Sequence, residues 1–140
     1  MNPNKPLDIV YRDDHLAVVN KPAGVMVHRS RLAGPRERFV LQMLREQVGR
    51  RVYPVHRLDK PTSGALLFAL DRTAARKMAA RFARKQVEKT YVAVVRGFVE
   101  DSGDIDRPLR ADVYSKRSPP LIKTARTLFW PLARIELDFP

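Results

Sequence analysis

The residues of this chain best suited to chemistry lie in one short segment, "HRLDKPTSG", from His56 to Gly64. Asp59 stands there between the cations Arg57 and Lys60, just before the apolar run "ALLFAL", which predicts a buried strand. An ionised carboxylate in this position could attack a sugar carbon or remove a proton from it, and nearby cations would favour its charged form. Many loop aspartates only order a turn, so the segment alone leaves both interpretations open.

The wider segment "HRLDKPTSGALLFAL" resembles the catalytic motif of the RluA-type pseudouridine synthases. The stretches "NKPAGVMVHRS" (20–30) and "KQVEKTYVAVVRG" (85–97) resemble two further parts of the same family, and the match extends from about Leu7 to Leu109. The resemblance implies that Asp59 is the reactive residue in converting uridine to pseudouridine, without a cofactor. Pro61 and the Arg29-Ser30 pair are most like members that modify tRNA, and ribosomal RNA is the alternative substrate.

Four residues are candidates for substrate binding, and the resemblance implies roles for three of them. Arg57 would fill the space left by a flipped-out nucleotide and contact the catalytic carboxylate. Tyr91 would stack on the uracil, and Lys89 completes the K-x-Y pair of the family. From the residues alone, Arg57 could equally contact a phosphate or form a surface ion pair, and Tyr91 could be a half-buried strand residue. We interpret His56 as a positioning residue, because an imidazole at a strand entrance commonly bonds to backbone.

The charge of the chain indicates a polyanionic partner. Lys and Arg number 27 against 15 Asp and Glu, which gives a net charge of +12. One basic cluster follows residue 28, and a second occupies a predicted helix after residue 71. We expect RNA backbone contacts from Arg29, Arg31, Arg76, Arg81 and Arg84, although a solvated helix face is the alternative for any one of them.

Other classes of protein fit less well. Without cysteine, neither a disulfide framework nor a thiolate metal site is available, and the three histidines lack the spacing of metal ligands. We therefore expect no metal. Since no apolar run has the length of a membrane span or a signal peptide, we expect a cytoplasmic protein that does not contact membranes. A hydrolase using Asp59 and His56 is a weaker alternative, because the sequence places no second carboxylate.

The pattern of apolar residues predicts an α+β fold with a mixed, largely antiparallel sheet. Residues 1–6 are expected to be a flexible lead-in, and residues 7–140 one domain, the N-terminal portion of a synthase catalytic domain. The predicted elements are a hairpin (7–11 and 15–20), a helix (37–48), a buried strand (65–70), a helix capped by Asp71, a strand (89–95), loops (100–120) and two strands (124–130 and 132–139).

The family carries a further basic motif that this chain lacks before Pro140. The final stretch "LARIELDF" predicts a strand, so we expect an unfinished sheet with an exposed edge. The chain would then be a fragment of a longer synthase or would be completed by a partner. A non-catalytic RNA-binding fragment is accordingly the alternative function.

Overall fold

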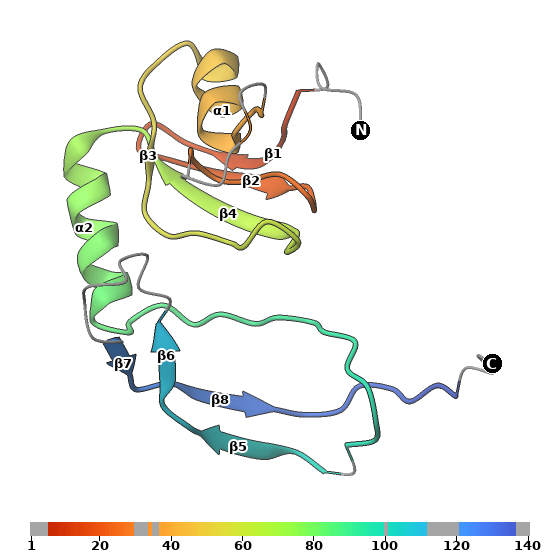
Figure 1. Cartoon of the computed structure of the whole chain (residues 1–140). Coiled ribbons are helices and arrows are strands. Elements are labelled where there is room, and N and C mark those ends of the chain that lie inside the picture. The colour runs from red at the N-terminus through yellow and green to blue at the C-terminus, as the bar shows by residue number, and fades with distance from the viewer. Residues whose placement is uncertain (1–5, 30–33, 35–36, 100, 112–120, 137–140) are drawn as a thin grey trace. The chain divides into compact units, whose positions relative to one another are not determined.

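The structure is a computed structural model that describes residues 6–29, 34, 37–99, 101–111 and 121–136. The chain divides into two compact units, residues 1–90 and residues 91–140 (Figure 1). Helices and antiparallel strands together confirm the predicted α+β class. The single domain over residues 7–140 stays a prediction. No helix among the described residues is long and apolar enough to cross a bilayer.

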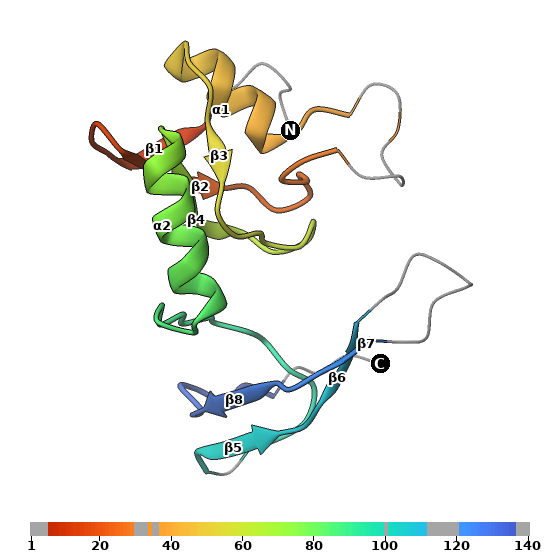
Figure 2. The same cartoon turned by 90° about the vertical axis from the view of Figure 1, so that its left-hand side faces the viewer.

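The first unit is built on a four-stranded antiparallel sheet in the order β1-β2-β4-β3 (Figure 2). Its strands are β1 (Asp8–Arg12), β2 (Leu16–Lys21), β3 (Tyr53–Pro54) and β4 (Gly64–Ala69). The predicted hairpin and the predicted buried strand are both confirmed. β2 and β4 pair without interruption from Leu16–Ala69 to Lys21–Gly64, so the turn before Gly64 lies beside the end of β2.

The core of the first unit forms where one face of this sheet meets the helix α1 (Val40–Val48). Alternate residues of β2 and β4, including Val19 and Phe68, are fully buried with Leu44 of α1. The helix begins three residues later than predicted, because Phe39 is still extended and bridges Met26. It ends at Gly49, which has a φ of 69° and was predicted to terminate it.

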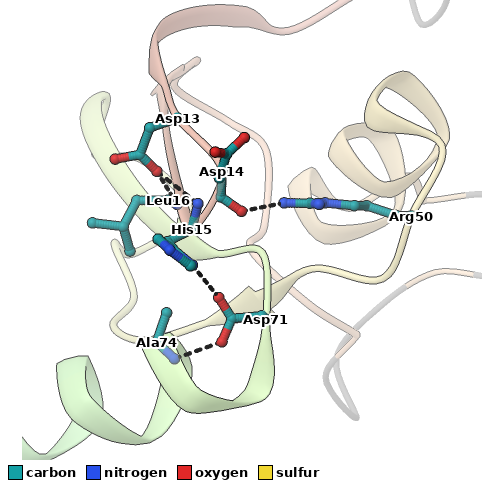
Figure 3. Close-up of polar contacts among 7 residues, drawn as sticks. All are labelled: Asp13, Asp14, His15, Leu16, Arg50, Asp71 and Ala74. Atoms are coloured by element: carbon teal, nitrogen blue, oxygen red, sulfur yellow. Dashed lines mark hydrogen bonds and ion pairs between the residues drawn. The ribbon is translucent and has the colours of Figure 1, made fainter.

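The helix α2 (Arg72–Ala83) begins where the sequence predicts, directly after Asp71. Asp71 Oδ1 accepts a hydrogen bond from the Ala74 amide at 2.8 Å, and Asp71 Oδ2 lies 2.7 Å from His15 Nδ1. His15 belongs to the β1–β2 turn, in which Asp13 accepts hydrogen bonds from two backbone amides. Figure 3 shows how this pair connects the hairpin to the first turn of α2.

The second unit contains two separate antiparallel strand pairs, β5 with β8 and β6 with β7. The strands are β5 (Gly103–Asp106), β6 (Leu109–Ala111), β7 (Leu121–Lys123) and β8 (Arg126–Phe129). The prediction of loops throughout residues 100–120 was therefore wrong at 103–106 and 109–111, since β5 pairs with β8 and β6 pairs with β7. Residues 100 and 112–120 of that prediction lie outside the described residues. An ion pair between Asp104 and Arg126, 2.6 Å apart, joins β5 to β8.

Two strand predictions in this part of the chain were also wrong. The β-rich stretch 89–95 is extended without pairing, and residues 132–136 form no strand, while 137–139 lie outside the described residues. The strand 124–130 is confirmed as β8. Among the described residues, no buried apolar residue lies beyond Leu70, and Val94, Leu132 and Ile135 are each at least 72% exposed. The described part of the second unit thus has no core of its own.

The His15–Asp71 pair should make the first unit more stable in mild acid than in mild base. The hydrogen bond and charge of Asp71 raise the pKa of His15. The pKa of Asp71 is lowered by the Ala74 amide and then by His15, so Asp71 stays ionised in mild acid. The stabilisation is complete below the ordinary histidine pKa, about 6.5, and is lost as the pH rises through the higher folded value. Urea midpoints at about pH 5.5 and 8.5 should differ less in His15→Gln than in the parent. An equal pH dependence in both proteins would contradict this assignment.

Candidate active site

Asp59 lies in the loop between β3 and β4, at the end of the sheet where β4 begins. Its side chain is 75% exposed, and its Oδ1 accepts a hydrogen bond from Arg57 Nη2 at 3.2 Å. Arg57 is itself 63% exposed, so this ion pair is screened by water and holds the carboxylate only weakly. The carboxylate is therefore accessible to a substrate, with one cationic side chain beside it.

The backbone of this turn, in contrast, is firmly held. The Thr62 amide donates to the Asp59 carbonyl at 3.1 Å, which closes the turn. The carbonyl of Lys60 accepts from the Gly24 amide at 2.7 Å and from Lys21 Nζ at 3.2 Å. Gly24 has a φ of 83°, a conformation that glycine adopts without strain. The segment that follows β2 thus fixes the residue next to Asp59.

Lys21 is the most unusual residue near the turn, because it is charged and fully buried. Its ammonium also donates to the carbonyls of Pro22 at 2.9 Å and Val25 at 2.7 Å. Burial lowers the pKa of Lys21, and the negative charge of Asp59 opposes that shift. Sequence reasoning missed this residue, although its place before Pro22 in "NKPAG" is a signal that could have found it.

His56 makes a backbone contact of the kind that the sequence analysis expects. Its Nε2 accepts a hydrogen bond from the Leu67 amide of β4 at 2.9 Å, and its ring stacks on Phe82 of α2 with centroids 4.8 Å apart. Burial lowers the pKa of His56, and the charge of Lys89 lowers it further. A neutral imidazole whose acceptor nitrogen is already engaged is suited to positioning the loop.

The ammonium of Lys60 pairs with a carboxylate other than that of Asp59. Its Nζ lies 2.6 Å from Glu37 Oε1, in the segment that precedes α1. Glu37 Oε2 also accepts from the Gly34 amide at 3.2 Å. Two cations flank Asp59 in sequence, but the structure gives a direct ion pair with Asp59 only to Arg57 among the described residues.

Lys89 and Tyr91 occupy an extended, exposed segment at the junction of the two units. Lys89 is the second-last residue of the first unit, and Tyr91 is the first residue of the second, with 59% of its surface exposed. Tyr91 was expected on an alternating strand, and that expectation was wrong, because residues 89–95 pair with no other strand among those described. The role of Tyr91 against uracil rests on the sequence resemblance.

The predicted RNA-contacting cations of α2 are exposed and lie near an open hollow. Arg76, Arg81 and Arg84 are all solvent-accessible. The hollow, of about 660 Å³, is lined by Lys77, Ala80, Arg81, Arg84 and Gln86, with no carboxylate. A second hollow of about 610 Å³ is lined by Gln42, Arg45, Glu46, Gly49, Arg50 and Arg51. Arg29 is exposed, and Arg31 lies outside the described residues.

Comparison with known proteins decides the family. The family model described as RNA pseudouridylate synthase matches residues 15–134, which include the whole of the turn described above. The chain belongs to this family. The prediction of a pseudouridine synthase relationship from the sequence motifs is therefore confirmed.

Named relatives agree with this family. The chain is 46% identical over 139 residues to tRNA pseudouridine synthase C of Haemophilus ducreyi, covering 95% of this chain and 56% of the relative. It is 46% identical over 137 residues to the protein of the same name from Vibrio cholerae, covering 94% and 56%. The solved structure of human RNA pseudouridylate synthase domain containing 1 superposes with a TM-score of 0.67 at 27% identity, covering 90% of this chain and 53% of that one. The chain spans about half the length of these proteins.

Removing the ammonium of Lys21 should destabilise the first unit. Lys21→Met keeps a similar stem but takes the donor from three carbonyls, so we expect a loss of about 2–4 kcal/mol in the free energy of unfolding. The exposed Lys77→Met is the control, with an expected change within about 0.5 kcal/mol. Urea unfolding measures both. Equal midpoints for the two variants would show that the buried ammonium is dispensable.

Proposed function

We propose that this chain is the N-terminal portion of an RNA pseudouridine synthase that isomerises uridine in tRNA, with Asp59 as the reactive carboxylate. One observation carries the proposal: the Asp59 side chain is open to solvent while hydrogen bonds hold its own carbonyl and that of Lys60, the next residue. This turn lies inside the region matched by the family model. A reactive group needs this combination of access and fixed position.

The reaction breaks the bond between C1′ of the ribose and N1 of the uracil, turns the base, and joins C1′ to C5. N1 gains a proton, and C5 loses its hydrogen to solvent, so no cofactor is required. Asp59 would either attack the sugar or remove a proton from it, and both routes need the ionised carboxylate. Arg57 Nη2 donates a hydrogen bond to that carboxylate at 3.2 Å.

The target nucleotide has to leave the RNA stack to reach Asp59. Arg57 is exposed beside the carboxylate and would occupy the vacated space. Tyr91 would stack on the extruded uracil, and Lys89 would contact the same nucleotide. Both roles are supported by the match of these two residues to the K-x-Y pair of the family. His56 would hold the loop against β4 and α2 through its contacts with Leu67 and Phe82.

Phosphate contacts would come from the two groups of basic residues that the sequence contains. Arg81 and Arg84 border a hollow that no carboxylate lines, Arg76 lies on the same helix, and Arg29 and Arg31 belong to the segment after β2. The relatives named tRNA pseudouridine synthase C favour tRNA over ribosomal RNA as the substrate. This substrate is in keeping with a cytoplasmic location.

We further propose that catalysis needs the remaining half of the synthase domain. The chain spans 56% of the length of its curated relatives, and the large apolar side chains of the second unit are exposed. Such surface is normally covered by another part of the protein or by a partner. By itself the chain would act as an RNA-binding portion of the enzyme, which is the second candidate function.

Asp59→Asn should abolish pseudouridine formation and leave RNA binding unchanged, because the amide keeps the shape of the side chain but lacks the negative charge. The chain would be joined to the C-terminal portion of the Haemophilus ducreyi relative. Release of tritium from C5 of uracil in a tRNA transcript then measures the reaction, and filter binding measures affinity.

Asp14→Asn is the matched control, since it removes one carboxylate at the opposite end of the sheet. Asp59→Asn activity within about tenfold of the parent, a loss of only about 1.4 kcal/mol in transition-state stabilisation, would exclude Asp59 as the reactive group. If the chain without the added portion is already active, the requirement for the second half is wrong.

The cations around the hollow of α2 should supply phosphate contacts. Replacing Lys77, Arg81 and Arg84 by Gln should weaken tRNA binding and lower the slope of log affinity against log salt by about 2–3. The control replaces Arg45, Arg50 and Arg51 by Gln, which changes the net charge equally at a hollow that Glu46 also lines. Equal losses in both triple variants would indicate that net charge alone, with no contribution from position, determines the affinity.

A further inference from the structure

Glu37 connects the segment before α1 to the turn that carries Asp59. Its Oε1 lies 2.6 Å from Lys60 Nζ, and its side chain is only 23% exposed, compared with 52% for Lys60. Glu37 is 22 residues away from Asp59 in sequence, and no motif of the chain singles it out. Its contact is therefore visible only in the folded protein.

Lys60 is held at both of its ends. Its carbonyl accepts hydrogen bonds from the Gly24 amide and from the buried ammonium of Lys21, while its side chain meets Glu37. The two carbonyl contacts fix the position of the peptide, and the Glu37 contact adds a constraint from a separate segment of chain. The turn is consequently held by the segment after β2 and by the segment before α1.

Arg38, the residue after Glu37, is the cation of a second ion pair. Arg38 Nη2 lies 2.5 Å from Glu46 of α1, so two adjacent residues tie this segment to the helix and to the turn. The two carboxylates differ in exposure: Glu46 is 66% exposed and pairs on the surface, whereas Glu37 is largely covered. A partly covered pair is less screened by water and holds its partners more firmly.

We propose that Glu37 is a positioning residue for the reaction, which holds the Asp59 turn in place through Lys60. This inference rests on the proposed role of Asp59. Without the ion pair the turn would keep its backbone hydrogen bonds but would move more, and misplacement of a reacting group by about 1 Å can cost up to about 100-fold in rate. Glu37 itself touches neither the substrate nor the reacting atoms.

Amide hydrogen exchange on the 140-residue chain tests the mechanical part of this inference. In Glu37→Gln, the Thr62 and Gly24 amides should exchange about tenfold faster, because both donate to carbonyls of the turn. The Leu67 amide of β4, which donates to His56 Nε2, should exchange at the parent rate. Lys60→Gln should behave like Glu37→Gln, and Lys60→Arg, which retains the charge, should preserve the protection. Unchanged exchange at Thr62 and Gly24 in Glu37→Gln would overturn the inference.

Steady-state kinetics test the functional part, on the chain joined to the C-terminal portion of the relative. Glu37→Gln should lower kcat about tenfold with KM within about twofold, since most of the proposed phosphate contacts come from residues outside the turn. Glu46→Gln makes the same change in net charge, and both constants should stay at the parent values. A Glu37→Gln variant with faster exchange but parent kcat would also overturn the proposal.

These outcomes are separable from a failure of the proposed function. If the parent protein forms no pseudouridine, the proposed function fails, and the exchange rates alone decide whether Glu37 holds the turn. If the parent is active and Glu37→Gln changes KM but not kcat, Glu37 acts through RNA binding and the positioning role is wrong.

Discussion

The site depends on one physical constraint, the burial of the Lys21 ammonium beneath the turn. A cation removed from water has to be compensated by polar partners, and here the partners are backbone carbonyls from two segments, Pro22 and Val25 on one side and Lys60 on the other. Because the donor cannot be satisfied unless both segments are present, the loop after β2 and the loop before β4 must order together. The buried ammonium of Lys21 thus helps to fix the backbone that presents the accessible carboxylate of Asp59.

Much of the first unit could be predicted from local pattern. The alternation in β2 and the apolar run of β4 are properties of single segments, as is the Asp71 cap of α2, so each was found in the sequence. The start of α1 was not, because its first amides donate to the carbonyls of Met26 and Val27, whose proximity is a tertiary feature. The same reason explains why Glu37 escaped notice: its partner Lys60 lies 23 residues away in sequence.

The second unit departs further from the sequence-based expectation for a related physical reason. Residues 89–95 have the β-branched composition of a strand, but a strand also requires a partner with free hydrogen-bonding groups, and none of the described residues provides one. Conversely, β5 and β6 form in a stretch rich in turn residues, because β8 and β7 supply partners. The composition of a segment indicates a preference for extended backbone. Whether that segment forms a strand depends on a neighbouring segment with which it can form hydrogen bonds.

The openness of the Asp59 side chain has a consequence for how the site distinguishes its substrate. Water around an exposed carboxylate weakens its electrostatic effect on anything nearby, so in the free protein this group is a poor reagent. Under the proposed function, a folded polynucleotide would itself displace that water as it settles over the turn. The substrate would then act as the lid of the site, and a free nucleoside, too small to cover the turn, would leave the carboxylate hydrated and unreactive.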